Sequence, residues 1–381
     1  MTKLKLGVST LIGTIIGAGI LGIPYVVAKA GIIAGLFDII GIGLLMLLLN
    51  LYLGEVTLRT NGNHQLSGYA GLYLGRIGKK ILSGAMVVEI YGALLAYIMG
   101  VGTSLATLFG GDYFFYGLGF FIIASFLIYK GLRTIGKTEF FMVMGGLSVV
   151  ALISVLGFFQ MDVSNFDLGK GEVFIPYGVV LFAYLGVTSV PLLKELLSQD
   201  RKEVKKAIII GSVIPIVVYC LFALSVVGAI GIDGFQALQP DQRIASAALE
   251  IYFGGFMGFV AILFGLFSMS TACLALGMAL EEMYKYDYGF KKGNAWLFTV
   301  FVPLALFVLN RIFDITDFMG VLGVTGAIAG GVTCTLIVAM FHKAKKIGKR
   351  KPEYKIRGYW LLSVLIVLCL VLGVIFEFMP K

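Results

Sequence analysis

The chain is poor in charge. Only 13% of its 381 residues are Asp, Glu, Lys or Arg, about half of the roughly 25% that soluble domains carry. Hydrophobic residues make up 59% of the chain, and the mean hydropathy is +0.98. The composition excludes a soluble globular domain and indicates an all-α polytopic protein of the lipid bilayer.

Several kinds of site are also missing. The two histidines, His64 and His342, fall in expected loops, and the sequence contains neither H-E-x-x-H nor G-x-S-x-G. A zinc protease needs the first motif and an α/β-hydrolase the second, so we expect no enzyme. The four cysteines lie within apolar runs, so no disulfide framework is implied.

The net charge is +9, and the Lys and Arg residues that produce it are divided unevenly between the two expected sides of the membrane. Of the 30 Lys and Arg, 25 fall in alternate loops on one side of the expected spans. The other five are Lys29, Lys170, Arg243, Arg311 and Lys381. Because Lys and Arg concentrate in cytoplasmic loops, we expect a plasma-membrane protein with a cytoplasmic N-terminus and an extracytoplasmic C-terminus. The basic tract 343–357 is then expected near anionic lipid, and no nucleic acid is expected as a partner.

Apolar runs predict eleven transmembrane helices. They are 6–28, 31–58, 81–109, 113–129, 140–159, 174–197, 207–230, 244–280, 295–309, 318–341 and 359–378. The run 244–280 is too long for one span, so its first turns are expected along the outer interface. Span one begins a first set of five spans, and span six begins a second set. Because five is an odd number, the second set crosses the membrane in the opposite direction to the first. The prediction is a five-plus-five inverted repeat, 1–159 and 174–341, with 359–378 as an extra helix.

The apolar run of span one is interrupted in its middle. Gly17, Gly19 and Gly22 lie within six residues, and Pro24 follows. In a helix interior, glycine costs about 1 kcal/mol and proline about 3 kcal/mol relative to alanine. Backbone freed from helical bonding inside hydrocarbon is tolerated only where protein or a wet cavity satisfies it. Span one is therefore either a broken helix that binds something or a helix whose small residues allow close packing.

Span six carries a matching interruption. Gly186 precedes Pro191 by the same interval that separates Gly19 from Pro24. Interrupted segments at corresponding positions of two halves of a membrane chain point to the binding site of a transporter. We therefore expect helices 1 and 6 to be broken there.

The residues at these interruptions resemble a known family. Residues 13–25, Gly-Thr-Ile-Ile-Gly-Ala-Gly-Ile-Leu-Gly-Ile-Pro-Tyr, resemble the first-helix signature of the amino acid/auxin permease family, within the amino acid–polyamine–organocation superfamily. Phe182-Ala183-Tyr184-Leu185-Gly186 with Pro191 and Glu195 resembles its sixth helix, and residues 92–97 its third. Through span number and order, the resemblance covers essentially the whole chain. It implies the leucine-transporter-like fold and amino acid transport by alternating access.

An amino acid needs donors for its carboxylate and acceptors for its ammonium group. In such a fold, the amides around Gly17, Ala18 and Gly19 are expected to bind the carboxylate. The other expected substrate-site residues are Phe182, Ala183 and Leu185 with their carbonyls, Gly186, Tyr184 as a gate or pocket wall, and Tyr97 through its hydroxyl. The alternative for each aromatic residue is to fill the core of the bundle.

The resemblance also implies a sodium site between span one and span eight. Its expected ligands are the carbonyls of Gly13, Ile16 and Phe267 and the hydroxyls of Ser270 and Thr271. Neutral oxygens of this kind suit a monovalent cation. The alternative is that these hydroxyls bond back to carbonyls of their own helix.

Glu89 is the most informative acidic residue, because a charge at its depth costs at least about 2.5 kcal/mol on insertion scales. It is expected to be neutral, paired with a cation, or a proton-coupling group. Asp38 lies nearer the outer end of its span and is expected to reach water. Proton-driven relatives can place a lysine ammonium from span five at the sodium position, but 140–159 contains no Lys or Arg. That absence favours Na⁺ over H⁺ as the coupling ion.

We expect a secondary active amino acid transporter with no cofactor beyond the coupling ion. The small Ala18 and Ala183 favour a bulky apolar or aromatic substrate. Two alternatives stay open. One is an amino acid sensor without flux. The other is a polyamine or organocation transporter, which would need several acidic residues at its cavity. The oligomeric state stays open too.

Overall fold

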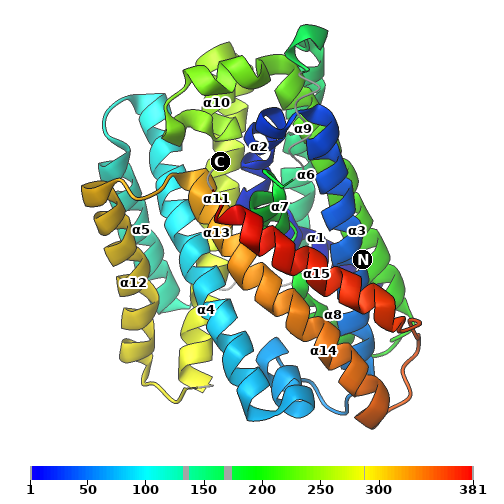
Figure 1. Ribbon diagram of the computed structural model, residues 1–381. Coiled ribbons are helices and arrows are strands. Elements are labelled where there is room, and N and C mark those ends of the chain that lie inside the picture. Colours follow the sequence, from blue (N-terminus) through cyan, green and yellow to red (C-terminus); the bar gives the residue numbers. More distant parts are fainter. Residues whose placement is uncertain (1, 132–136, 167–173, 287, 380–381) are drawn as a thin grey trace.

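The structure is a computed structural model that describes residues 2–131, 137–166, 174–286 and 288–379. Across these ranges, the regular secondary structure is entirely helical (Figure 1). Within the described residues, ten helices are long and apolar enough to cross a membrane, or up to eleven if the bent pair Lys3–Ile15 and Ala18–Ala30 is one span. The chain is therefore an all-helical, multi-pass membrane protein. Two of the cations assigned to the outer side, Lys170 and Lys381, lie outside the described residues.

Consecutive elements follow the predicted order closely. The first half contains α1 (Lys3–Ile15), η1 (Ala18–Leu21), α2 (Ile23–Ala30), α3 (Ile32–Leu58), α4 (Leu66–Phe109), α5 (Tyr113–Lys130), α6 (Lys137–Phe159) and the short turn η2 (Val163–Asn165). The second half begins with α7 (Tyr177–Ala183), η3 (Val187–Ser189), α8 (Val190–Leu196), α9 (Glu203–Ala237), η4 (Pro240–Arg243) and α10 (Ala245–Phe253). It continues with α11 (Gly255–Tyr286), α12 (Lys292–Phe313), α13 (Phe318–Thr325), η5 (Gly326–Gly330), α14 (Gly331–Ile347) and α15 (Trp360–Glu377).

Two helices begin or divide at glycines with positive φ. The long run 244–280 separates into α10 and α11 at Gly254 and Gly255, whose φ angles are 50° and 53°. Its first turns form a helix of their own, so the run is not one continuous span, which agrees with its excessive length. Helix α4 begins well before the expected residue 81 and is kinked at Gly75, with φ 75°. Glycine adopts such angles without the steric cost that a β-carbon brings.

The expected loop position of His342 is wrong, because this residue lies inside α14. Its Nε2 is 2.8 Å from the Ser363 hydroxyl of α15. The C-terminal end of this helix extends beyond the apolar run, since lysines are good helix formers even where they are too polar for hydrocarbon.

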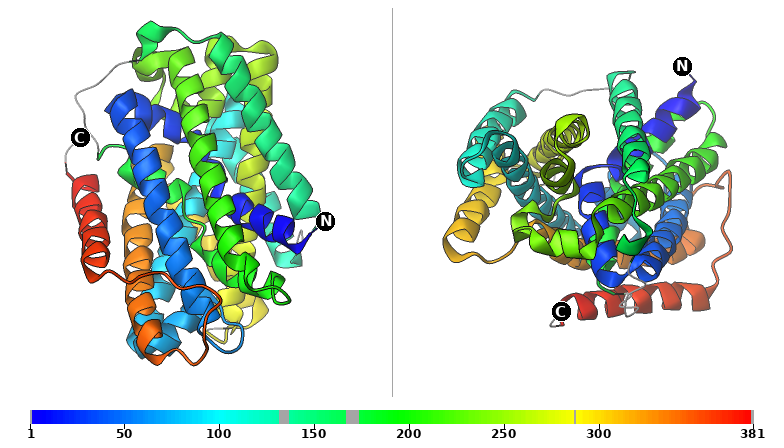
Figure 2. Two further views of the ribbon diagram at one scale, coloured as in Figure 1. Left: turned by 90° about the vertical axis from the view of Figure 1, so that its right-hand side faces the viewer. Right: turned by 90° about the horizontal axis from the view of Figure 1, so that it is seen from above.

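Burial separates central spans from peripheral ones. Within the most apolar windows, 72% of the α7–α8 span and of the α13–α14 span is buried inside the protein, against 17% for α6 and 22% for α15. Figure 2 shows α15 lying along the outside of the bundle. The interrupted span six therefore lies in the middle of the protein, with α6 and α15 at its periphery.

The α13–α14 span contains a single π-helical turn, η5, at residues 326–330. This turn packs directly on α7. A β-carbon added at Gly326 would lie 2.8 Å from the Phe182 Cβ and even closer to the Gly178 carbonyl oxygen. π turns of this kind are rare and occur often at functional sites.

Candidate functional site

Span one is broken where the glycines predict. Helix α1 ends at Ile15, and the axes on either side of the break are bent by 48°. The Gly17 N–H donates to the Ile15 carbonyl at 3.0 Å and the Ile20 N–H to the Gly17 carbonyl at 3.4 Å. An unbroken α-helix would direct these two N–H groups to the carbonyls of Gly13 and Ile16. Those two carbonyls have therefore lost their helical donors.

Span six is broken in the corresponding place. Helix α7 ends at Ala183 and α8 begins at Val190, with η3 between them. The Leu185 N–H turns back to the Phe182 carbonyl at 3.0 Å. Phe182 and Ala183 are buried, and Leu185 is half-buried. The three residues after Ala183, followed by η3, therefore connect the two half-helices through irregular backbone deep inside the protein.

The two breaks cross each other in direct contact. A β-carbon added at Gly19 would lie 2.7 Å from the Ala183 Cα, and one added at Gly186 would lie 2.5 Å from the Ile15 Cγ1. Each break thus needs a glycine because the other chain segment is so close. Gly17 differs, since a β-carbon there meets nothing within 4 Å. The crossing therefore has open space beside Gly17.

Tyr219 of α9 joins the two breaks, and sequence reasoning missed it. Its hydroxyl is 2.8 Å from the Ile15 carbonyl oxygen and 2.9 Å from the Ala183 carbonyl oxygen. The residue is fully buried. A tyrosine in the middle of an otherwise apolar span is the signal that was present, because a buried hydroxyl needs a partner. The last carbonyls of α1 and α7 thus meet at one point.

Two other predicted tyrosines lie nearby. The ring of Tyr184 packs against that of Tyr219 with centroids 5.0 Å apart, and its hydroxyl donates to the Ile39 carbonyl at 3.1 Å. Tyr184 therefore also ties the span-six break to α3. Tyr97 of α4 is buried as well. The structure thus brings together the predicted substrate residues of spans one and six.

The predicted sodium ligands are not gathered in the same way. The Thr271 hydroxyl donates to the Phe267 carbonyl at 2.9 Å and is 3.1 Å from the Ser268 carbonyl, which is the alternative foreseen for these hydroxyls. Phe267 itself is 49% exposed. Among the described residues, no hydrogen bond joins Ser270 or Thr271 of α11 to span one.

The neighbours of α1 and α11 also show that the predicted sodium ligands of these two helices lie apart. A β-carbon at Gly13 of α1 would touch Val143 of α6 at 2.5 Å. Helix α11 meets the first span further along, where a β-carbon at Gly265 would lie 3.3 Å from the Leu21 side chain of η1. Helix α6 lies against α1, whereas α11 approaches η1.

Two buried carboxylates lie at the depth of the bilayer without a cation. Glu89 of α4 is 9% exposed, and its Oε2 has no hydrogen-bond partner among the described residues. No ion pair to Glu89 is present there either, so pairing with a described cation is excluded. Asp38 of α3 is also buried, with an unpartnered Oδ2 in the same part of the chain. The expectation that Asp38 reaches water is wrong, because neighbouring helices cover it.

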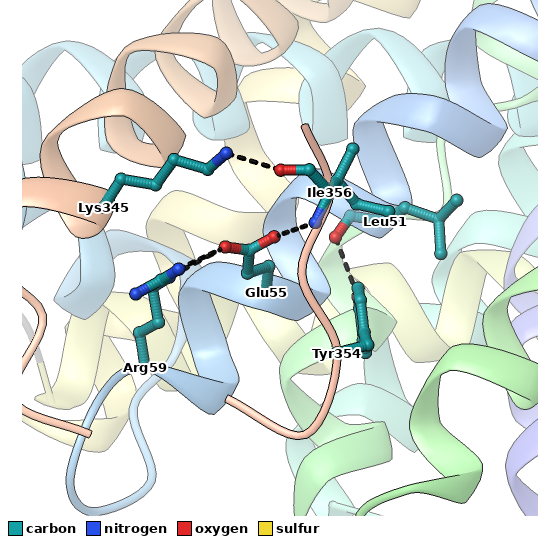
Figure 3. A network of polar contacts seen from close by, with 6 residues as sticks. All are labelled: Leu51, Glu55, Arg59, Lys345, Tyr354 and Ile356. Carbon is teal, nitrogen blue, oxygen red and sulfur yellow. Dashed lines mark hydrogen bonds and ion pairs between the residues drawn. The ribbon is translucent and has the colours of Figure 1, made fainter. Parts of the chain in front are cut away.

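The C-terminal end of α3 is held by the segment 348–359, which we call the strap (Figure 3). Glu55 is fully buried, pairs with Arg59 at 2.7 Å and accepts the Ile356 N–H at 2.5 Å. Lys345 of α14 donates to the Ile356 carbonyl at 2.5 Å, and the Tyr354 hydroxyl donates to the Leu51 carbonyl at 2.8 Å. The strap is therefore fastened to α3 at several points.

Further bonds extend this fastening. The Arg350 N–H donates to the Arg59 carbonyl at 3.0 Å, and its guanidinium pairs with Glu353. Burial alone would raise the pKa of Glu353, but the hydrogen bond and charge of Arg350 lower it below its usual value, so the pair is ionised at neutral pH. The basic tract was expected to lie at lipid, yet Lys345 and Arg350 bond within the protein.

The C-terminal half of span six is attached to the same region. Lys194 of α8 is buried and donates to the carbonyls of Thr60, at 2.9 Å, and Gly62 in the loop after α3. These carbonyls lie just beyond the C-terminal end of α3, where the helix dipole favours a positive charge.

Several known proteins are similar in sequence to this chain over most of its length. Tyrosine-specific transport system 1 of Haemophilus influenzae is 26% identical over 390 residues, which cover 98% of this chain and 95% of that protein. The Tryptophan-specific transport protein of Shigella flexneri is 21% identical, covering 97% and 92%. Glutamine transporter 2 of Aliivibrio fischeri is 24% identical, covering 88% of each.

The sequence model of one family matches almost the whole chain. The match runs over residues 1–377 and so includes both helix breaks, Tyr219 and the strap. Since this match far exceeds half of the chain, the protein belongs to the tryptophan/tyrosine permease family.

Proposed function

We propose that this protein is a secondary active transporter that carries an aromatic amino acid across the membrane by alternating access. The observation that carries the proposal is the crossing of two broken helices, Gly19 on Ala183 and Gly186 on Ile15, beside open space at Gly17. Irregular backbone at membrane depth is tolerated where it lines a cavity, and broken helices form transporter sites in this way. The relatives named for tyrosine and tryptophan support an aromatic substrate.

The backbone at the breaks offers both polar groups that an amino acid needs. The amides of Ala18 and Gly19 begin the second half of span one, where N–H groups and the helix dipole favour an anion such as the α-carboxylate. The carbonyls of Phe182, Ala183 and Leu185 lie across the crossing as acceptors for the ammonium group. Tyr97 and Tyr184 then border the side chain of the substrate.

Uptake into proteoliposomes tests this function. The purified protein is expected to accumulate labelled tyrosine or tryptophan, and unlabelled aromatic amino acids should compete far better than glutamine or putrescine. Binding without uptake would identify a sensor instead. Competition by putrescine equal to that by tyrosine would identify an organocation transporter.

The same proposal includes the leucine-transporter-like fold of the amino acid/auxin permeases, with repeats at 1–159 and 174–341, 359–378 outside them, and the N-terminus in the cytoplasm. The contacts at the crossing support a two-fold relation. Gly19 and Gly186 occupy equivalent places before Pro24 and Pro191, and each lies against the last residue of the other half-helix, Ala183 or Ile15. Such reciprocity is what an inverted repeat produces.

Coupling to Na⁺ is the favoured mechanism, and coupling to H⁺ is the second candidate. The loss of helical donors at Gly13 and Ile16 supports sodium, because these carbonyls are left to accept another partner. Glu89 supports protons, because a buried carboxylate without a cation nearby can bind and release one. Uptake with Na⁺ replaced by choline at equal pH on both sides separates them. Undiminished uptake that an inward proton gradient stimulates would overturn the sodium mechanism.

A further inference from the structure

The Tyr219 hydroxyl occupies an unusual electrostatic position. Its two acceptors, Ile15 and Ala183, are the last residues of α1 and α7, so two helix C-termini point at one oxygen. Each C-terminus carries a partial negative charge. A hydroxyl has one hydrogen and cannot fully satisfy two carbonyls. The Ile15 carbonyl also accepts the Gly17 N–H at 3.0 Å. These two carbonyls have four lone pairs and only the Gly17 N–H and the Tyr219 O–H as donors among the described residues, so this point can accept a further donor.

Two other buried tyrosines of the bundle, Tyr177 and Tyr354, show a simpler arrangement. Tyr177 donates to the Leu370 carbonyl at 3.2 Å, and Tyr354 donates to the Leu51 carbonyl at 2.8 Å. Each has one acceptor, as a residue that only satisfies its own hydroxyl requires. Tyr219 instead has two acceptors, one from each broken span. That difference indicates a role beyond packing.

We propose that Tyr219 positions the Ile15 and Ala183 carbonyls as the acceptors of the substrate's ammonium group and takes part in that contact. An ammonium group has three N–H donors, and a hydroxyl can accept one hydrogen bond while donating another. The Tyr219 oxygen accepts from the ammonium while its hydrogen stays on one carbonyl, and the other carbonyl accepts directly. This inference rests on the proposed function, because it takes the substrate to be an α-amino acid.

Tyr219→Phe tests the inference, with Tyr177→Phe as the matched control that also removes one buried hydroxyl–carbonyl bond. We expect Tyr219→Phe to weaken L-tyrosine binding about tenfold, the usual effect of losing a hydrogen bond to a charged group. Tyr177→Phe should change it less than twofold. For 3-(4-hydroxyphenyl)propionate, which lacks the ammonium group, Tyr219→Phe should leave competition unchanged. An equal loss for both ligands would mean a merely structural role and would overturn the inference.

A second variant keeps the test decisive if Tyr219→Phe does not fold. Replacing Tyr219 with 4-aminophenylalanine supplies two N–H donors, so both carbonyls are satisfied and the protein should be stable. Because the acceptors are then occupied, L-tyrosine binding should still be about tenfold weaker. Wild-type affinity in either variant would overturn this inference alone. A wild-type protein that binds no aromatic amino acid would overturn the proposed function and this inference together.

Discussion

Gly17 and Gly19, two residues apart in the same break, are expected to respond in opposite ways to an added methyl group. In Gly19→Ala, the new carbon would lie 2.7 Å from the Ala183 Cα and 2.8 Å from its Cβ. In Gly17→Ala, the new carbon would meet nothing within 4 Å. The backbone angles of both residues lie outside the left-handed region, so packing alone sets the difference.

The magnitude follows from these distances. Carbon atoms in ordinary contact are about 3.5–4.0 Å apart, so the methyl at Gly19 is roughly 1 Å too close to atoms that include backbone. Backbone atoms cannot rotate aside as a flexible side chain does. Overpacking of this kind costs about 1–3 kcal/mol. Gly17→Ala has no such cost and should gain about 0.4–1 kcal/mol, because alanine restricts the unfolded chain.

Thermal unfolding of the purified, substrate-free protein measures both effects. We expect Gly19→Ala to unfold several degrees lower than wild type and Gly17→Ala to unfold at the same temperature or slightly higher. Gly17→Val then probes the open space, and its branched side chain should weaken tyrosine binding at least tenfold in a scintillation proximity assay while the fold is kept. A Gly19→Ala protein as stable as wild type would refute the close crossing of the two breaks. Unchanged binding by Gly17→Val would refute the location of the site.

Three further predictions concern other charged and polar residues. Glu89→Gln should leave the thermal unfolding temperature nearly unchanged, because no described cation loses its partner; a large fall would show that the carboxylate is charged and paired. Ser270→Ala combined with Thr271→Ala should reduce sodium-dependent stabilisation and uptake together several-fold, measured against choline, and loss of neither would remove these hydroxyls from the ion site. Glu55→Gln breaks a buried pair, a loss of about 3–5 kcal/mol, and should speed limited proteolysis of the strap. Glu203 is half-buried and pairs with the exposed Lys206 at 3.9 Å, so Glu203→Gln should have little effect on stability. Equal effects of the two changes would contradict the role of burial.

The parts of the site that sequence could predict are those with a local cause. Glycine and proline act on the backbone at their own positions, so the breaks at Gly17 and Gly186 were predictable from the residues around them. The division of α10 from α11 was predictable from length, because a bilayer limits the number of apolar residues in a span.

The remaining parts depend on contacts between distant segments. Tyr219 is one of 18 tyrosines in the chain, and only the packing of α9 against two other spans gives its hydroxyl two carbonyls. Lys194 is one of several cations in a basic loop, and nothing local predicts that it turns inward to the end of α3. Thr271 had two partners available, and the structure shows the one on its own helix.

The π turn η5 has a consequence for how related sequences should be compared. Each residue of an α-helix rotates the chain by roughly 100° about the axis, and a π turn holds one residue more than an α-helical turn does. The face that α14 presents to α3 and α4, with Cys334 buried and Lys345 reaching the strap, depends on that additional residue. A relative that lacks one residue within 326–330 would turn this face away by about a quarter of a revolution. A one-residue gap there marks a reoriented helix rather than a shortened connection.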